Sequence, residues 1–382
     1  MSLRAKSLGI VVLIGAAVLV VWLWFAFGPR PAPVPVAHYP PNAELMQAIV
    51  RRQYGSPDVL SLERIEKPAV VDDRVLVRVH ASSVNPYDYH FMEGTPYILR
   101  LDAGMRVPKS IRLGVDFAGV VEAVGKSVTR FKPGDEVFGG ASGALAEYVN
   151  VREAGAIALK PARVSFEQAG VVAVAGLTAL QALRDSGHIR AGQKVLINGA
   201  SGGVGTFAVQ IAKSFGAEVT GVCSTRNVAL VRSIGADHVI DYTRENVTRS
   251  GQRYDLILDN VGNYPLLDFR HILTPKGTYL IVGAQITGNW IQPLWRPIKA
   301  TVLSPFVSQK FELVLSGLKQ KDVLFLADLM QSGKLTPVID RRYTLSEVPA
   351  AVRYLEAGHA RAKVAIDLSP PAAALSDSPA AQ

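Results

Sequence analysis

The chain has 382 residues, of which 49% are hydrophobic and 19% charged, and 41 Lys and Arg against 32 Asp and Glu give a net charge of +9. This length suggests two domains and the composition supplies a sizeable core, which excludes a disordered or collagen-like chain. The positive surplus forms no basic block, so nucleic-acid binding is not indicated, and the single Cys223 permits neither a disulfide nor a multi-cysteine zinc site.

An uncharged, almost wholly apolar stretch covers residues 9–27. About 20 helical residues span the roughly 30 Å hydrocarbon layer of a bilayer. A cleavable signal peptide is the alternative, but its apolar region is usually about 7–15 residues long. We therefore expect an uncleaved transmembrane anchor over residues 1–28, with the lipid bilayer as a partner, and a proline-rich linker over residues 29–45.

A strand-rich domain is expected where the folded part begins. From residue 46 to about 151, short β-like runs at residues 75–84, 114–125 and 132–139 are separated by Gly and Pro. This pattern is typical of a compact β domain. Similar texture returns after residue 334.

From about residue 165, strand-like and helix-like segments alternate. Such alternation predicts an α/β domain, in which a parallel sheet carries helices on its faces. The strands are expected at residues 194–197, 218–223, 256–260 and 278–282, and the helices at residues 204–215 and 228–234.

The sharpest local signal is VLINGASGGVG at residues 195–205, where a strand leads into four glycines and a helix follows. Glycines let the backbone approach a pyrophosphate, which binds at the helix N-terminus because free N–H groups and the helix dipole favour anions. This context favours a dinucleotide site over an ordinary turn. The predicted contacts are Gly199, Ser201, Gly202, Gly203, Val204 and Gly205.

The end of the second strand of this domain indicates which dinucleotide binds. An NAD site usually carries Asp or Glu about 20 residues after the glycines, where it accepts a hydrogen bond from the ribose 2′-OH. Residues 223–226 contain no acid, whereas Ser224 and Arg226 offer a hydroxyl and a cation that suit a 2′-phosphate. We therefore predict NADPH, and a solvated Arg226 is the alternative.

Eight stretches in fixed order carry a wider resemblance: MQAIVRRQYGSPDVL, SSVNPYDYHFMEG, LGVDFAGVVEAVGKSVTRFKPGDEVFG, AGLTAL, INGASGGVG, LVRSIGADHVIDY, YDLILDNVG and GHARAKVAIDL. Together they resemble the medium-chain dehydrogenase/reductase superfamily, in its zinc-independent quinone-oxidoreductase and enoyl-reductase branch. The resemblance implies a GroES-like domain over residues 46–164 and 334–368, a Rossmann domain inserted at residues 165–333, and a cofactor cleft between them. The Pro- and Ala-rich tail at residues 369–382 is expected to be disordered.

The resemblance also implies that no metal is bound. By motif position, the places where zinc alcohol dehydrogenases of the superfamily hold their catalytic metal fall on Asn85, Val115 and Val174. None of these residues offers a thiolate or an imidazole. Without a Lewis acid, the substrate must accept hydride readily, as an activated C=C bond or a quinone does.

The segment that directly follows the β-like run at residues 75–84 supplies the expected catalytic groups. An enolate that develops during reduction needs a hydrogen-bond donor. The resemblance places residues 86–90 beside the nicotinamide ribose and favours His90 as proton donor or relay, while a structural histidine and protonation by solvent stay open. The catalytic candidates are His90, Tyr89 and Asn85, and the further cofactor contacts are Pro86, Tyr87, Asp88, Tyr242, Asn260, Gly262 and Gly283.

The function expected from the sequence is a membrane-anchored, NADPH-dependent, zinc-free reductase of activated double bonds or quinones with a small-molecule substrate, lipophilic if the anchor is present. An enoyl-thioester reductase and a dinucleotide-binding scaffold or sensor with little turnover stay open. The charge bias around the anchor mildly favours a catalytic part outside the cell. NADPH is a cytosolic cofactor, so we expect the catalytic part on the cytoplasmic side. The aromatic and basic segment at residues 288–306 could cap the pocket, form a homodimer contact or rest on the membrane.

Overall fold

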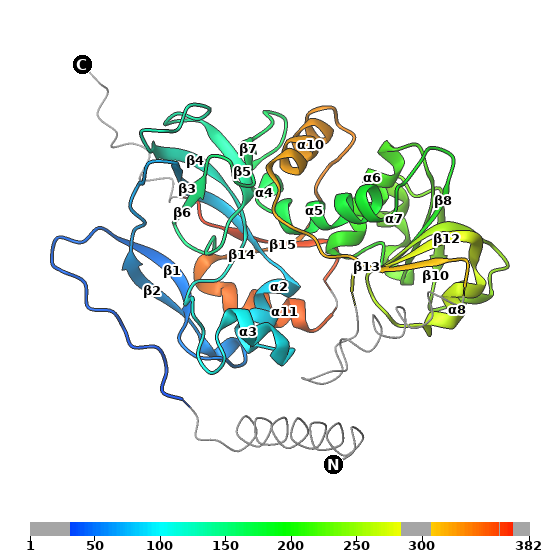
Figure 1. Ribbon diagram of the computed structural model, residues 1–382, viewed down its shortest axis with the longest axis horizontal. Coiled ribbons are helices and arrows are strands. Elements are labelled where there is room, and N and C mark those ends of the chain that lie inside the picture. The colour runs from blue at the N-terminus through cyan, green and yellow to red at the C-terminus, as the bar shows by residue number, and fades with distance from the viewer. Residues whose placement is uncertain (1–30, 284–306, 359, 370–382) are drawn as a thin grey trace, which may run out of the picture.

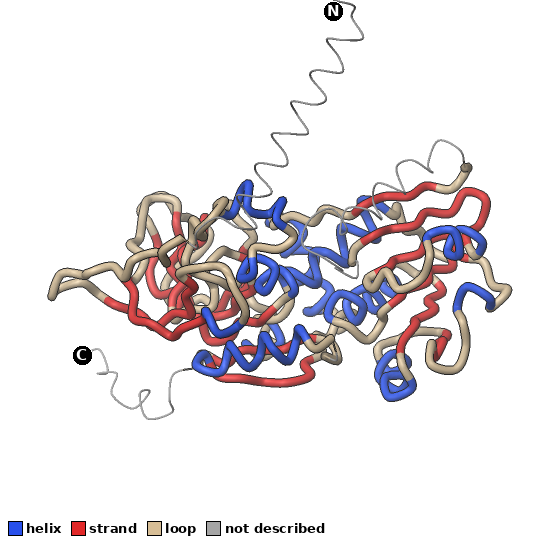
Figure 2. The backbone as a smooth tube through the Cα atoms, turned by 90° about the horizontal axis from the view of Figure 1, so that it is seen from below, coloured by secondary structure: helices blue, strands red, loops and turns tan. Residues whose placement is uncertain are grey.

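The computed structural model describes residues 31–283, 307–358 and 360–369. Within them, two sheets occupy opposite halves of the molecule (Figure 1). One sheet has seven mostly antiparallel strands and the other has six parallel strands, and strands β1 (Leu45–Arg51) and β2 (Leu60–Glu66) form a separate antiparallel pair. Figure 2 shows much of the helical structure lying between the two groups of strands.

The seven-stranded sheet has the order β14-β15-β3-β4-β5-β7, with β6 paired to β3. Valines alternate along β3 and their side chains are buried, as the two-residue period of a strand requires. Strand β15 pairs antiparallel with β3, so the end of the chain returns to the sheet built by its first third. Its strands are β3 (Arg74–Val84), β4 (Asp116–Val124), β5 (Glu136–Gly140), β6 (Tyr148–Arg152), β7 (Ile157–Leu159), β14 (Ile339–Thr344) and β15 (Lys363–Asp367).

The parallel sheet has the order β10-β9-β8-β11-β12-β13. Strand β8 pairs with β9 on one side and with β11 on the other, so the chain changes direction across the sheet at β8. Ligands of open α/β sheets bind at the carboxyl ends of the strands at such a switch point. Its strands are β8 (Lys194–Asn198), β9 (Glu218–Cys223), β10 (His238–Asp241), β11 (Tyr254–Asp259), β12 (Leu273–Ile281) and β13 (Lys310–Leu313).

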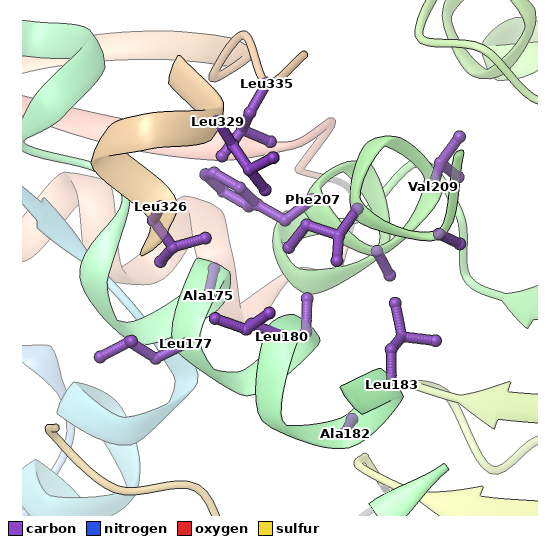
Figure 3. Close-up of a cluster of buried hydrophobic side chains, with 14 of the residues drawn as sticks. Ala175, Leu177, Leu180, Ala182, Leu183, Phe207, Val209, Leu326, Leu329 and Leu335 are labelled. Carbon is purple, nitrogen blue, oxygen red and sulfur yellow. The ribbon is translucent and has the colours of Figure 1, made fainter. Parts of the chain in front are cut away.

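Helices α5 (Ala173–Gln181), α6 (Gly203–Ser214) and α10 (Gln320–Gln331) pack into one apolar cluster beside the parallel sheet. Leu180 and Phe207 are fully buried there and lie close together between α5 and α6 (Figure 3). This packing fixes the start of α6 relative to the sheet. The other described α-helices are α2 (Pro86–Glu93), α3 (Arg100–Ala103), α4 (Phe166–Ala169), α7 (Val228–Ser233), α8 (Leu266–His271) and α11 (Val348–Glu356).

The expected α/β architecture is confirmed, but the expected membrane location is wrong. No helix among the described residues is long and apolar enough to cross a bilayer. Even α6 and α10, with 12 residues each, reach only about 18 Å. We therefore withdraw the membrane location, the cytoplasmic placement relative to a membrane, and the bilayer as a partner. Residues 1–28, on which that expectation rested, lie outside the described residues.

Three further expectations remain untested. Residues 288–306, with their pocket, homodimer and membrane alternatives, lie outside the described residues, as do residues 370–382 of the tail. The predicted domain boundaries stay a prediction, although β15 joins the seven-stranded sheet as the resemblance implied.

Candidate functional site

The glycine turn, residues 199–205, joins the end of β8 to the start of α6. Gly199 has a φ of +78°, a left-handed conformation that favours glycine. A Cβ atom added at Gly205 would lie 2.1 Å from the carbonyl oxygen of Gly199, so Gly205 is needed for the turn to pack against α6. A Cβ atom would lie 3.4 Å from the carbonyl oxygen of Gly199 at Gly202, and 3.4 Å from Cδ of Lys363 at Gly203. A ligand could therefore approach the backbone at the N-terminus of α6 far more closely at these two residues than at Gly205.

A hydroxyl-rich corner lies where β9 ends beside the glycine turn. The Asn227 side chain is buried, and its Nδ2 donates to Oγ of Ser201 (3.0 Å) and of Ser224 (3.2 Å). Its Oδ1 has no hydrogen-bond partner among the described residues. Arg226 is exposed, and Tyr242, just beyond β10, is held by a hydrogen bond from its backbone N–H to the carbonyl of Cys223 (3.1 Å).

The carboxyl ends of β11 and β12 form the other side of the turn. The buried Asp259 carboxylate accepts hydrogen bonds from the backbone N–H of Gly262 (2.9 Å) and from Nδ2 of Asn198 (2.7 Å). A Cβ atom at Gly283 would lie 2.0 Å from the carbonyl oxygen of Asn260, so the two loops touch. The Oδ1 atom of Asn260 is buried without a described partner. Asn260 Oδ1 is therefore, after Asn227 Oδ1, the second buried oxygen beside the glycine turn that has no hydrogen-bond partner among the described residues.

Helix α2 begins with Asn85 as its N-cap and Pro86 at its first position. The Asp88 carboxylate accepts from the backbone N–H of Asn85 (2.8 Å) and of Gly114 (3.0 Å), so both of its oxygens have partners inside the protein. Tyr87 is 46% exposed and stacks on Phe91, with ring centroids 4.2 Å apart. The helix thus presents Tyr87 outward and buries Asp88 beneath it.

His90 is half-buried in α2 and packs edge-on against Tyr89, with ring centroids 4.4 Å apart. Burial lowers the pKa of His90, and the charge of Glu93 opposes that shift only in part. Burial raises the pKa values of Tyr87 and Tyr89. At neutral pH all three side chains are therefore uncharged groups that can donate a hydrogen bond, and Nδ1 of His90 has no described partner.

Asn85 and Val174, two of the three residues at the expected zinc-ligand positions, both donate hydrogen bonds to the carboxylate of Asp116. Nδ2 of Asn85 donates to Asp116 (3.0 Å), the backbone N–H of Val174 donates to the same side chain (2.6 Å), and Val115 is buried. Over the described part of the chain, no group of three or more His, Cys, Asp or Glu side chains could hold a metal ion. The absence of zinc stays a prediction, and metal analysis of the purified protein tests it.

The two halves of the site meet at the start of β15. The backbone N–H of Ala362 donates to the carbonyl of Ser201 (2.7 Å), and Ala362 also forms a parallel bridge with Gly202. Ala362 has a φ of +66°, a backbone conformation that residues other than glycine rarely adopt. Because β15 pairs with β3, whose last residue precedes Asn85, this contact brings the glycine turn to the sheet edge from which α2 starts.

The structure therefore brings the predicted residues together in two groups: the cofactor residues at the edge of the parallel sheet, and residues 85–90 in α2. Sequence reasoning missed Asp116, Asp259, Ala362 and Lys363. An isolated charge inside an apolar strand-like run is the signal that could have found Asp116 and Lys363, since buried charges need partners. Ala362 carries no such signal, because its backbone conformation depends on its contact with Ser201.

Comparisons with family models match both parts of the chain. Residues 71–162 match the alcohol dehydrogenase GroES-like domain, and residues 234–366 match the zinc-binding dehydrogenase model. The chain is also similar to the solved structure of the quinone oxidoreductase from Coxiella burnetii, with a TM-score of 0.73, 31% identity, and coverage of 85% of this chain and all of that one.

Three curated relatives share about a third of their residues with the chain. The mitochondrial NAD(P)H oxidoreductase RTN4IP1 of Bos taurus is 32% identical over 86% of this chain and 90% of its own length. The trans-enoyl reductase pgmF of Aspergillus terreus is 36% identical over 78% and 86%. The chloroplastic NADPH-dependent alkenal/one oxidoreductase of Arabidopsis thaliana is 35% identical over 84% and 79%.

Proposed function

Because the chain belongs to the medium-chain dehydrogenase/reductase superfamily, we propose that it is an NADPH-dependent reductase of activated carbon–carbon double bonds or quinones. Its relatives show that the chain is an NAD(P)H oxidoreductase with a GroES-like and a Rossmann-like domain. The observation that carries the proposal is the Ala362–Ser201 contact, because it sets the glycine turn beside the sheet that carries α2.

The residues at the parallel sheet fit a dinucleotide. Gly202 and Gly203 lie at the N-terminus of α6, where backbone N–H groups and the helix dipole favour a pyrophosphate and no side chain of these two residues blocks its approach. The prediction of NADPH agrees with the name of the Arabidopsis relative. We assign the 2′-phosphate to Ser224 and Arg226 at the hydroxyl-rich corner, since a guanidinium and a hydroxyl recognise phosphate oxygens.

When bound, NADPH supplies the hydride, and the protein supplies position and hydrogen bonds. We propose that Tyr87, Tyr89 and His90 face the reacting substrate and that His90 donates a proton or a hydrogen bond to the oxygen on which negative charge develops. The unpartnered Nδ1 and the lowered pKa of His90 support a neutral histidine with one nitrogen available for a new partner.

Asn85 and Asp88 receive a different role from the one that the sequence suggested. Their side-chain atoms are committed to partners inside the protein, so we propose that both residues hold α2 in place and do not touch the substrate. The cofactor contacts at Tyr242, Asn260, Gly262 and Gly283 remain part of the proposal.

An enoyl-thioester reductase is the second candidate, because the trans-enoyl reductase relative is 36% identical. The test is NADPH oxidation by the full chain, followed at 340 nm, with an enone, a quinone and an enoyl thioester at equal concentrations. We expect NADPH consumption with the enone or the quinone. Faster consumption with the thioester favours the second candidate, tight NADPH binding without consumption favours a scaffold or sensor, and absence of NADPH binding contradicts the proposal.

A further inference from the structure

Lys363, the first residue of β15, is a buried cation that the proposed chemistry does not use. Its side chain is only 3% exposed, and it precedes the apolar run of that strand. Its Nζ donates to Oδ1 of Asn85 and to Oδ2 of Asp116, the latter at 3.2 Å. A buried ammonium is unfavourable unless it is paired and hydrogen-bonded, so these two contacts account for its position.

The Asp116 carboxylate is the centre of this cluster and is fully buried. Its Oδ1 accepts from the backbone N–H of Val174 at 2.6 Å, and its Oδ2 accepts from Ser83, Asn85 and Lys363. These partners come from the start of α5, from β3, from the N-cap of α2 and from β15. One carboxylate therefore accepts hydrogen bonds from three separate segments, namely residues 83–85, the start of α5 and β15, and Lys363 is its only side-chain cation partner among the described residues.

The stem of Lys363 lies against the glycine turn. A Cβ atom added at Gly203 would be 3.4 Å from Cδ of Lys363, and the preceding residue, Ala362, donates its backbone N–H to Ser201. Lys363 thus has its stem beside the turn and its ammonium group bonded to the N-cap of α2. The contacts of this one side chain span the distance between the two halves of the proposed site.

We propose that Lys363 is a positioning residue that fixes helix α2 relative to the glycine turn for hydride transfer. The inference rests on the proposed function and deepens it. Without the ammonium group, Asn85 loses the donor to its Oδ1, and the N-cap of α2 loses this hydrogen bond to β15. Displacement of reacting groups by about 1 Å can lower a rate about 100-fold, so the loss should appear in kcat. The affinity for NADPH should change little, because the backbone of the glycine turn is intact.

The test compares full-length variants Lys363→Met, Asp116→Asn, the double variant and Lys363→Arg. Fluorescence titration with NADPH gives the dissociation constant and the concentration of binding sites. Dividing the rate by that concentration gives kcat per site, which excludes any misfolded protein. The matched control is Lys160→Met, since Lys160 is also a buried lysine (5% exposed side chain) paired with a carboxylate, Glu136, at 3.0 Å.

We expect Lys363→Met to lower kcat per site at least tenfold with an NADPH dissociation constant within threefold of wild type. The double variant removes the unpaired buried carboxylate charge, so its melting temperature should recover while its kcat per site stays low. Asp116→Asn alone, which keeps the Lys363–Asn85 contact, should retain more activity than the double variant, and Lys363→Arg should rescue kcat to within about threefold. Lys160→Met should leave kcat per site unchanged.

Wild-type kcat per site in the double variant would overturn the inference, because it would reduce Lys363 to a structural role. The double variant decides the matter even where Lys363→Met does not fold. A wild-type chain with no NADPH site contradicts the proposed function itself, and this inference with it.

Discussion

The backbone N–H of Ala362 donates a 2.7 Å hydrogen bond to the carbonyl of Ser201 in the glycine turn. Ala362 lies just before β15, and β15 belongs to the seven-stranded sheet because it pairs with β3. Ser201 follows β8, a strand of the parallel sheet. The bond therefore crosses between the two sheets at the proposed cofactor site. Ala362 makes this bond from a left-handed backbone conformation (φ +66°), which costs a residue other than glycine about 1–3 kcal/mol.

Substitutions in the glycine turn should separate cofactor binding from folding. Gly202→Val adds a side chain at the N-terminus of α6, where the nearest atom to the new Cβ, the Gly199 carbonyl oxygen, lies 3.4 Å away. We expect its NADPH dissociation constant to rise at least tenfold with little change in melting temperature. Gly205→Ala instead forces a Cβ to within 2.1 Å of the Gly199 carbonyl oxygen, and overpacking of this kind destabilises by about 1–3 kcal/mol. Equal NADPH affinity in Gly202→Val and wild type would place the cofactor elsewhere.

Replacement of Arg226 should change the preference between the two nicotinamide cofactors. A hydrogen bond to a charged group contributes about 1.5–3 kcal/mol, so Arg226→Ala should weaken NADPH binding about 10- to 100-fold. NADH lacks the 2′-phosphate, and its affinity should stay the same. Titration of both cofactors against wild type and variant measures the difference. A parallel loss for NADH, or tighter binding of NADH than NADPH by wild type, argues against the assignment.

His90→Phe should lower kcat about 100-fold if His90 is the proton donor, because general acid catalysis contributes about 10²–10⁴. The NADPH dissociation constant should stay within threefold, since the glycine turn is untouched. His271→Phe is the control, because His271 is an exposed residue at the end of α8. Steady-state kinetics with the best acceptor checks the result, and full kcat in His90→Phe would remove His90 from the mechanism in favour of protonation by solvent.

Asp88 should make the stability of the fold depend on pH. Burial, together with the charge of Asp116, raises the pKa of Asp88 to about 7, although two backbone N–H groups and Lys363 oppose the shift. The unfolded chain releases this proton near pH 3.8. The folded state therefore binds more protons between about pH 4 and pH 7, and the free energy of unfolding falls as pH rises through that window, by at most about 4 kcal/mol.

Asp88→Asn removes this titration, so its stability should change less between pH 5 and pH 8 than that of wild type. Urea unfolding of both proteins at the two pH values measures the difference. An identical pH dependence in the variant would show that Asp88 ionises normally in the folded state.

The regular elements follow from local pattern, because burial on one face imposes a period on the sequence. The expected strand at residues 218–223 matches β9, and the expected helix at residues 204–215 differs from α6 by one residue at each end. The β-like texture expected after residue 334 matches strands β14 and β15, with helix α11 between them.

The contacts between distant segments could not be derived from local pattern. The Lys363–Asp116 pair joins residues 247 positions apart, and neither sequence neighbourhood specifies its partner. Nothing in the sequence around Asn227 indicates that its side chain donates to the hydroxyls of both Ser201 and Ser224. Side chains that act through tertiary contacts are visible only when the packing is known.

Transfer of an isotopic label tests the central claim most directly. The full chain is mixed with an enone and with NADPH that carries deuterium at the transferable C4 position, and the product is analysed by mass spectrometry and NMR. The account predicts one deuterium at the β-carbon of the reduced enone and none at the α-carbon, which takes its proton from a protein group or water. NADPH that stays unoxidised with the enone and also with a quinone, or that is consumed without label in the reduced enone, would contradict the account.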